Sequence, residues 1–186
     1  MHMSGKLLAL STLLYAAAPV LGFDSVPFLG PLQPWEVSSL QVQSIPSSGD
    51  DADSIAVSLL ISNPNNITAG PAPHADGGGY LPFEQSTANC TAKWQSSGDW
   101  KASHCSEVSF PESYGVWTFE VVSLQEVAET AVQSVDIKFS LDYNVTRWGS
   151  VYYKLLEGTG HFDLGSSDGG DPVLVDPTIV QCQGTC

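Results

Sequence analysis

The feature that most constrains the fold is an eleven-residue segment, 135–145, in which apolar and polar side chains alternate without a break. Successive side chains of a β-strand point to opposite faces of the sheet, so this pattern predicts a strand with one dry and one wet face. The dry face would hold Val135, Ile137, Phe139, Leu141, Tyr143 and Val145, and the wet face Asp136, Lys138, Ser140, Asp142 and Asn144.

Shorter segments of the same kind recur along the chain, separated by Gly, Pro and Asn turns. A strand also leads out of Cys90 through Ala92 and Trp94, and the polar turn 96–99 then makes a hairpin-like excursion. Several strands at such spacing predict an all-β fold, a single antiparallel β-sandwich or β-barrel domain. The other expected strands are 35–37, 40–42, 54–62, 116–122, 148–156 and 161–164, with edge pieces at 173–175 and 178–182.

Three segments depart from this pattern. The apolar spacing in 124–132 fits a short helix, the only one we expect. Residues 64–88 are rich in Pro and Gly, which predicts a long irregular loop of the kind that is often functional. Residues 165–172 are rich in Gly, Ser and Asp, which predicts a flexible acidic segment within a β domain that spans 35–186.

The N-terminus has the layout of a secretory signal peptide. Lys6 is followed by an apolar run, 7–21, which is shorter than the roughly 20 residues that span a bilayer. Small residues precede Phe23, so we expect 1–22 to be removed and 23–34 to form an extended, proline-rich lead-in. The alternative is a signal anchor that stays in the membrane. No later segment of the sequence is apolar enough to cross a membrane. We therefore expect the mature chain to be secreted and extracellular.

Two further features fit that compartment. Three glycosylation sequons begin at Asn66, Asn89 and Asn144, which predicts an exposed position at each one that is used. The four cysteines form an even set, which in an oxidising compartment predicts disulfides. Three pairings are possible, and the most local one joins Cys90 to Cys105 and Cys182 to Cys186.

The charge excludes some partners. The formal net charge is −14, and removal of the signal peptide leaves 20 acids against 5 bases. Phosphate binding needs a basic face, so nucleic acid is an unsuitable partner, and so is an anionic membrane surface. The charge is explained by solubility in an acidic medium, or else by a cationic partner.

The block 35–155 resembles the Alternaria major-allergen-like family of small secreted fungal β-barrel proteins. The likeness rests on the 35–37 strand, a strand that ends in an Asn-Pro turn, the Cys90-Thr-Ala-Lys-Trp94 segment, Trp100, and Cys105. The resemblance implies a fungal origin, a Cys90–Cys105 disulfide and a role in allergenicity or in plant defence. It transfers no catalytic residue. The closing Cys182–Cys186 pair and the 64–88 loop depart from the family pattern.

Sequence motifs for catalysis are missing, so we assign no catalytic residue. Wet-face carboxylates are the best enzyme candidates, because glycosidases use two of them about 5 to 10 Å apart. These are Glu120, Asp136 and Asp142. We expect no cofactor and no metal site, since no histidine is placed at Phe23 for copper chemistry and the aspartates of 163–176 do not follow a calcium-loop spacing.

Aromatic side chains could instead stack against a ligand. Since Tyr152 and Tyr153 are adjacent on a strand, they must face opposite sides. Core packing is the competing explanation for each aromatic. The candidates are Trp94, Trp100, Trp148, Tyr152 and Tyr153.

Together these observations lead to two hypotheses. The first is a secreted non-enzymatic β-barrel protein of the allergen or effector-like type, which binds a host or cell-wall molecule: an extracellular protein, a glycan or a small aromatic ligand. The second is a carbohydrate-active protein, either a lectin-like module or a weak glycoside hydrolase that uses wet-face carboxylates. The sequence leaves the ligand and the oligomeric state open.

Overall fold

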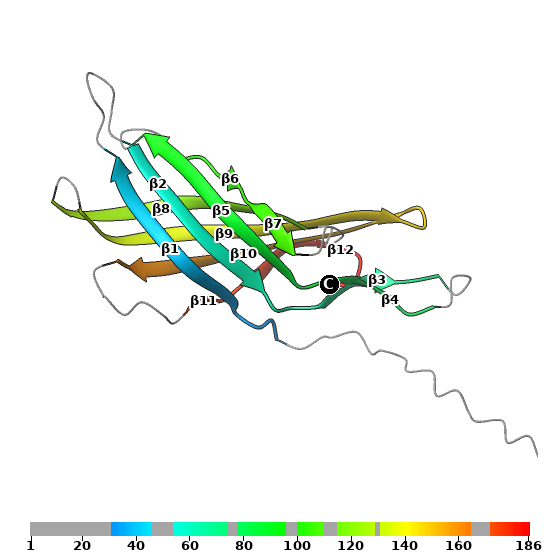
Figure 1. The fold of residues 1–186 in the computed structure, drawn as a ribbon. Helices are drawn as coiled ribbons and strands as arrows, with labels where there is room; N and C mark the ends of the chain where they lie inside the picture. Colours follow the sequence, from blue (N-terminus) through cyan, green and yellow to red (C-terminus); the bar gives the residue numbers. More distant parts are fainter. Residues whose placement is uncertain are drawn as a thin grey trace, which may run out of the picture.

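The computed structural model describes residues 31–45, 54–73, 78–95, 100–109, 115–128, 131–164 and 172–186. This part of the chain is all-β, contains no helix, and forms two five-stranded antiparallel sheets and a separate two-stranded hairpin (Figure 1). The predicted fold class is therefore confirmed. No helix within these ranges is long and apolar enough to cross a membrane. The predicted signal peptide, 1–22, most of the lead-in and 165–171 lie outside the described residues.

Each sheet follows a simple order. One sheet runs β11-β1-β2-β5-β7 and the other β12-β10-β9-β8-β6, while β3 pairs only with β4. The first sheet consists of β1 (Trp35–Ile45), β2 (Ser54–Asn63), β5 (Ser86–Gln95), β7 (Ser106–Ser109) and β11 (Val173–Val175). The second consists of β6 (Ser103–His104), β8 (Gly115–Ala128), β9 (Ala131–Arg147), β10 (Ser150–Asp163) and β12 (Thr178–Gln183). The hairpin consists of β3 (Ile67–Pro71) and β4 (Tyr80–Phe83).

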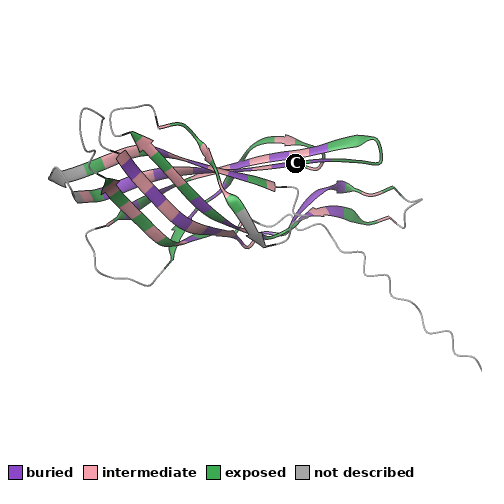
Figure 2. Cartoon of the chain, turned by 45° about the horizontal axis from the view of Figure 1, so that its top comes forward, coloured by how far each residue is buried: buried purple, intermediate pink, exposed green. Residues whose placement is uncertain are grey.

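The core lies between the two sheets, where their alternating apolar faces meet. Burial along β2 alternates residue by residue, and the same banding runs along the long strands in Figure 2. All six residues predicted for the dry face of 135–145 are buried. Trp35 of one sheet meets Trp117 of the other edge to face, with ring centroids 4.7 Å apart. This pairing of two apolar faces makes the domain a sandwich.

The two short segments expected at 35–37 and 40–42 form one strand, β1. The register of β1 against β2 shifts between Ser38 and Gln41, and Ser39 takes a positive φ of 55°. A bulge of this kind inserts an extra residue and changes which face the later side chains meet. The sequence alternation breaks at the same place.

The predicted helix at 124–132 is wrong. Residues up to Ala128 belong to β8, β9 begins at Ala131, and Gln125 pairs with Ser134 across the hairpin. Nine residues are too few to make a helix stable by themselves, whereas strand pairing satisfies the backbone at once. The side chains of 126–128 and 131 lie outside the description.

Two other expectations need correction. The stretch 64–88 is not an irregular loop throughout, because it contains β3, β4 and the start of β5. The strands expected at 148–156 and 161–164 are one continuous strand, β10, which begins at Ser150 and passes through Gly158 and Gly160. Both glycines lie under neighbouring side chains: a Cβ on either would come within 2.8 Å of Val175. The sequence suggested a break between two strands at these glycines. The structure shows instead that they allow close packing inside one strand.

A buried polar cluster fixes the chain where it leaves the first sheet. The Asn63 side chain donates to the Tyr143 hydroxyl at 2.8 Å, and that hydroxyl donates to the Glu84 carbonyl at 2.9 Å. The Asn65 side chain donates to Gln33 O and to Asn63 Oδ1. The Asn-Pro turn predicted at 63–64 is therefore anchored to the opposite sheet.

Both disulfides follow the most local pairing, Cys90–Cys105 and Cys182–Cys186, so the resemblance-based Cys90–Cys105 link is present.

Candidate functional site

One end of the sandwich collects several unusual features, and we call it the hairpin end. It consists of β3 and β4 with the described residues next to them (67–73 and 78–83), the outer part of the β9–β10 hairpin (143–154) and the C-terminal loop 182–186. In Figures 1 and 2 the two hairpins project from the same end of the sandwich, with the C-terminus between them. The C-terminal loop is joined to β3 by a hydrogen bond from Thr185 N to Ala69 O at 3.0 Å.

The tip of the β9–β10 hairpin carries an exposed tryptophan in a left-handed backbone conformation. Arg147 pairs with Ser150, so the turn consists of Trp148 and Gly149, with φ values of 50° and 74°. Two positive φ values define a type I′ turn, in which Asn-Gly is strongly preferred. A bulky residue in this conformation is uncommon and costs about 1 kcal/mol or more. Trp148 is nevertheless 41% exposed, and among the tryptophans that the structure describes it is the only exposed one.

Tyr152 packs against Trp148 and also contacts β3. Its ring meets Trp148 edge to face, with centroids 6.4 Å apart, and its hydroxyl donates to Pro71 O at 3.2 Å. A Cβ on Gly70 would come within 2.3 Å of the Tyr152 ring, so this position of β3 admits only glycine without a shift. Tyr152 is buried and therefore positions the site, contrary to its prediction as a stacking surface.

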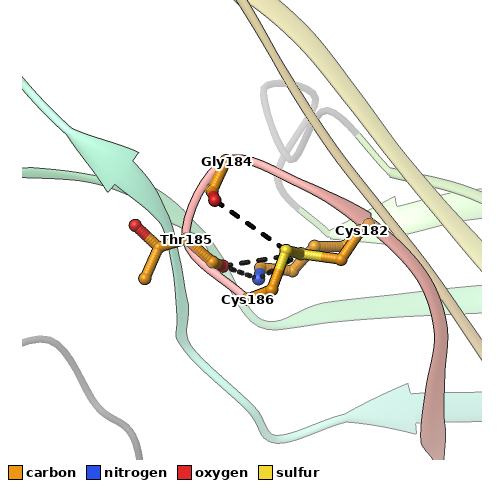
Figure 3. Close-up of a disulfide and its surroundings, with 5 residues drawn as sticks. Cys182, Gly184, Thr185 and Cys186 are labelled. Carbon is orange, nitrogen blue, oxygen red and sulfur yellow. Dashed lines mark hydrogen bonds between the residues drawn. A yellow bond between two sulfur atoms is a disulfide. The ribbon is translucent and has the colours of Figure 1, made fainter.

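The C-terminal loop lies over a buried lysine. Lys154 is 3% exposed, and its Nζ donates to Cys182 Sγ at 3.3 Å and to the Thr185 carbonyl (Figure 3). No described carboxylate lies within ion-pair distance of this nitrogen. Burial lowers the pKa of Lys154, because removal from water disfavours the charged form.

The five predicted stacking residues do not form one platform. Trp94 is half-buried, packs on Phe119 with centroids 5.5 Å apart, and donates from Nε1 to Lys101 O at 2.9 Å. Trp100 is also half-buried against the core. Both belong to the Cys90–Cys105 excursion, where packing accounts for them. Tyr153 lies on the opposite face of β10 from Tyr152.

That opposite face carries the predicted carboxylates. Asp136 and Asp142 are six residues apart on one strand, hence about 20 Å apart, too far to act as a glycosidase pair. Sequence reasoning missed Glu157, which faces Ser140 in register and is therefore the diagonal neighbour of Asp142, roughly 7–8 Å away. Residue positions at that spacing on one face allow the two carboxyl groups to reach the separation of about 6.5–9.5 Å that inverting glycosidases use.

The two members of this pair have different surroundings. Burial raises the pKa of Asp142, and its buried Oδ1 has no hydrogen-bond partner among the described residues. Glu157 is ion-paired with Lys138 at 2.9 Å. Tyr153 is the other diagonal neighbour of Asp142, and burial, followed by the charges of Asp142 and Glu157, raises the pKa of Tyr153.

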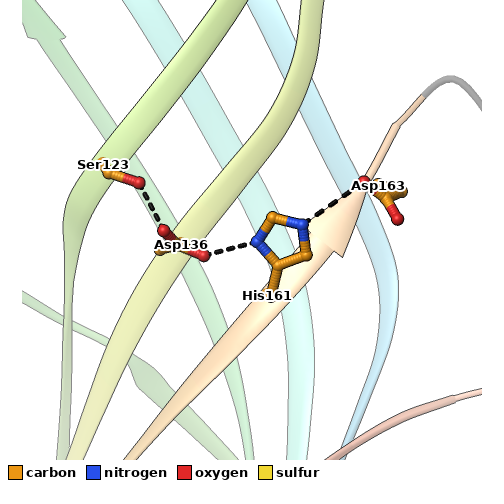
Figure 4. Close-up of polar contacts among 4 residues, drawn as sticks. All are labelled: Ser123, Asp136, His161 and Asp163. Carbon is orange, nitrogen blue, oxygen red and sulfur yellow. Dashed lines mark hydrogen bonds and ion pairs between the residues drawn. The ribbon is translucent and has the colours of Figure 1, made fainter.

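A polar cluster of four residues crosses the same face further along (Figure 4). Ser123 Oγ donates to Asp136, and His161 lies 2.6 Å from Asp136 through Nδ1 and 3.3 Å from Asp163 through Nε2. The hydrogen bond from Ser123 and then that with His161 lower the pKa of Asp136. The hydrogen bond with Asp136 raises the pKa of His161.

This cluster is not a nucleophilic triad. A serine nucleophile needs a histidine at its hydroxyl to take the proton, with the carboxylate behind the histidine. Here the carboxylate of Asp136 stands between Ser123 and His161, so the serine has no base. Asp136 and His161 are direct partners in the register of β9 and β10. Their contact could be predicted from the sequence only if that register were already known.

The three sequon asparagines Asn66, Asn89 and Asn144 are all exposed. No group of three or more metal-ligating side chains occurs among the described residues. Comparisons with family models, with curated proteins and with solved structures found no match.

Proposed function

We propose that this protein is a secreted, non-enzymatic binding protein of the allergen or effector-like type, which recognises a host or cell-wall molecule through its hairpin end. The observation that carries the proposal is Trp148: an exposed indole in a turn position that prefers Asn. Turn stability does not account for a tryptophan there, whereas ligand contact does. Strain of this kind persists where surrounding structure holds it, often at binding sites.

The chemistry of the hairpin end favours a ligand with a flat apolar face. Two large aromatic residues are exposed in the described chain, Trp148 and Tyr80, and both belong to this end. Aromatic rings stack well on the apolar face of a pyranose or on another aromatic ring, and they lose little conformational entropy on binding. A glycan of the cell wall or of a host glycoprotein is the ligand class that we favour.

The extracellular setting of the proposal rests on the signal-peptide layout of 1–22 and on the two disulfides. It predicts that protein collected from culture medium begins at Phe23 and carries glycan on one or more of Asn66, Asn89 and Asn144. Intact mass before and after enzymatic deglycosylation measures both properties.

The binding test uses glycan arrays and co-sedimentation with insoluble plant and fungal wall fractions. The variant W148N removes the indole and places the favoured residue in the turn, so the fold is retained. The matched control is V122A, which shortens another exposed apolar side chain, 55% exposed on β8. We expect W148N to bind at least tenfold more weakly and V122A to bind as the wild type does. Equal binding by W148N, or no binding by the wild type, would contradict the proposal.

A second candidate function is glycoside hydrolysis on the outer face of β9 and β10. It is favoured by the Asp142–Glu157 pair, in which one carboxyl has a raised pKa and the other is held by a lysine. It ranks second because Asn144 is exposed beside Tyr153, where a glycan would cover this face. Turnover that is lost in D142N and E157Q but kept in E120Q, with inversion at the anomeric carbon, would establish it.

A further inference from the structure

The two sulfurs of the Cys182–Cys186 disulfide have unequal surroundings. Cys186 is exposed, whereas Cys182 is half-buried with its Sγ 3.3 Å from Lys154 Nζ. In the other disulfide Cys90 is fully buried and Cys105 half-buried. Cys186 is therefore the most exposed of the four cysteines and the one that an external reagent reaches most easily.

We propose that Cys182–Cys186 is a thiol-exchange site, at which a small-molecule thiolate attacks Cys186 Sγ and Cys182 leaves as a thiolate beside Lys154. The first observation behind this is the direction of access. The second is the buried lysine itself: a 3% exposed amine with no described carboxylate as ion-pair partner. A thiolate at Cys182 would supply the missing negative charge within hydrogen-bond reach.

The exchange is balanced without a further co-reactant. The attacking thiol loses its proton to solvent, its sulfur bonds to Cys186 Sγ, and the electron pair of the broken disulfide goes to Cys182 Sγ. A second thiol then attacks the outer sulfur of the mixed disulfide. It releases Cys186 as a thiolate and the two small molecules as their own disulfide. Two electrons pass from two thiols to the protein.

Lys154 acts on the first step by stabilising the leaving group. A nearby cation lowers the pKa of a thiol, and a leaving thiol of lower pKa departs faster. Cys182 and Lys154 are direct partners in the pairing of β12 with β10, so the contact is set by the sheet register. The lysine is a positioning and electrostatic residue; the reacting atoms are the sulfurs.

Opening the disulfide would remove the covalent link that closes the C-terminal loop of the hairpin end. Gly184 lies against Ala69 and Tyr152, and Thr185 N donates to Ala69 O at 3.0 Å, so these contacts would then hold the loop without its covalent link. The exchange site does not depend on what the hairpin end binds, so this inference stands or falls separately from the proposed function.

The test uses the full secreted protein with a limiting amount of reduced glutathione at neutral pH. Samples are quenched by alkylation at intervals, and peptide mapping identifies which cysteines have opened and which carries glutathione. We expect Cys182 and Cys186 to open well before Cys90 and Cys105, with glutathione on Cys186. This selectivity is measured on the wild-type protein and needs no variant to fold.

The variant K154Q removes the charge, and the matched control K138Q makes the same change on the outer face. We expect K154Q to open roughly three- to tenfold more slowly, as a leaving thiol whose pKa is higher by one to two units would, and K138Q to open as the wild type does. Glutathione found on Cys182, simultaneous opening of both disulfides, or an unchanged rate in K154Q would overturn the proposal.

Discussion

Replacing Tyr143 by Phe tests whether the buried polar cluster holds the sandwich together. The Tyr143 hydroxyl joins three parts of the chain, because it lies on β9, accepts from Asn63 at the end of β2 and donates to the carbonyl of Glu84 after β4. The phenylalanine ring can stay stacked on Phe83, whose centroid is 4.6 Å away. The substitution therefore removes the oxygen and leaves the packing.

The cost can be worked out from the two partners. Asn63 is 1% exposed, and its Oδ1 is held by Asn65 N at 3.0 Å and by Asn65 Nδ2 at 2.7 Å, so its amide cannot turn to find water. A buried donor left without a partner costs about 1–3 kcal/mol. The Glu84 carbonyl belongs to an exposed residue and can be hydrated. We expect a loss of about 2 kcal/mol in the free energy of unfolding.

The assay is urea unfolding followed by tryptophan fluorescence, with Y153F as the matched control. Tyr153 is half-exposed on the outer face, and its hydroxyl lies 3.4 Å from Gln181 Oε1, so Y153F is expected to stay within about 0.5 kcal/mol of the wild type. With an m value of about 2 kcal/mol/M, Y143F should lower the midpoint by about 1 M. Equal midpoints for the two variants would refute the role given to the cluster.

Two other predictions follow from the structure. The pKa of His161 is raised by its contact with Asp136, and the pKa of Asp136 is lowered by the hydrogen bond from Ser123 and by that contact, so the contact stabilises the fold fully between about pH 3.8 and 6.5. Below this window the stabilisation is lost as Asp136 gains a proton, and above it as His161 loses one. Titration of His161 by NMR should show a lower pKa in D136N than in the wild type, and an unchanged value would contradict the contact. Replacing Cys90 and Cys105 by alanine opens a loop with a sequence separation of 15, and should lower the free energy of unfolding in urea by about 3 kcal/mol. A decrease of less than about 1 kcal/mol would contradict this prediction.

Much of the sandwich follows from local pattern. The alternation of 135–145 and of 54–62 predicted β9 and β2, because a buried face fixes the register of a strand and so leaves a period of two in the sequence. The edge pieces near the C-terminus are also confirmed, as β11 and β12. In contrast, the wrong helix at 124–132 came from apolar spacing read without the partner strand, and strand pairing decided the outcome.

The candidate site could not be predicted in the same way, because it depends on pairings between distant segments. Trp148 was singled out as an aromatic, but its exposure comes from a two-residue turn that depends on where β9 and β10 pair. Lys154 gave no signal, since a lysine in a strand is expected to face solvent. It faces inward because Tyr152 and Leu156, on the same face of β10, are buried.

The hairpin end exists because the second sheet is longer than the first. β9 and β10 have 17 and 14 residues, whereas β1 and β2 have 11 and 10. The inward face of β10 therefore runs beyond the opposing strands, and its last side chains, Lys154 and Tyr152, are covered by β3 and the C-terminal loop. The β3 and β4 strands contribute Ile67, Ala69, Leu81 and Phe83 to the buried core, whereas most residues of the C-terminal loop 182–186 are partly or fully exposed. The hairpin therefore gives the exposed Trp148 and Tyr80 a rigid support, and an exchange at Cys182–Cys186 would act on the loop that lies at the edge of this core.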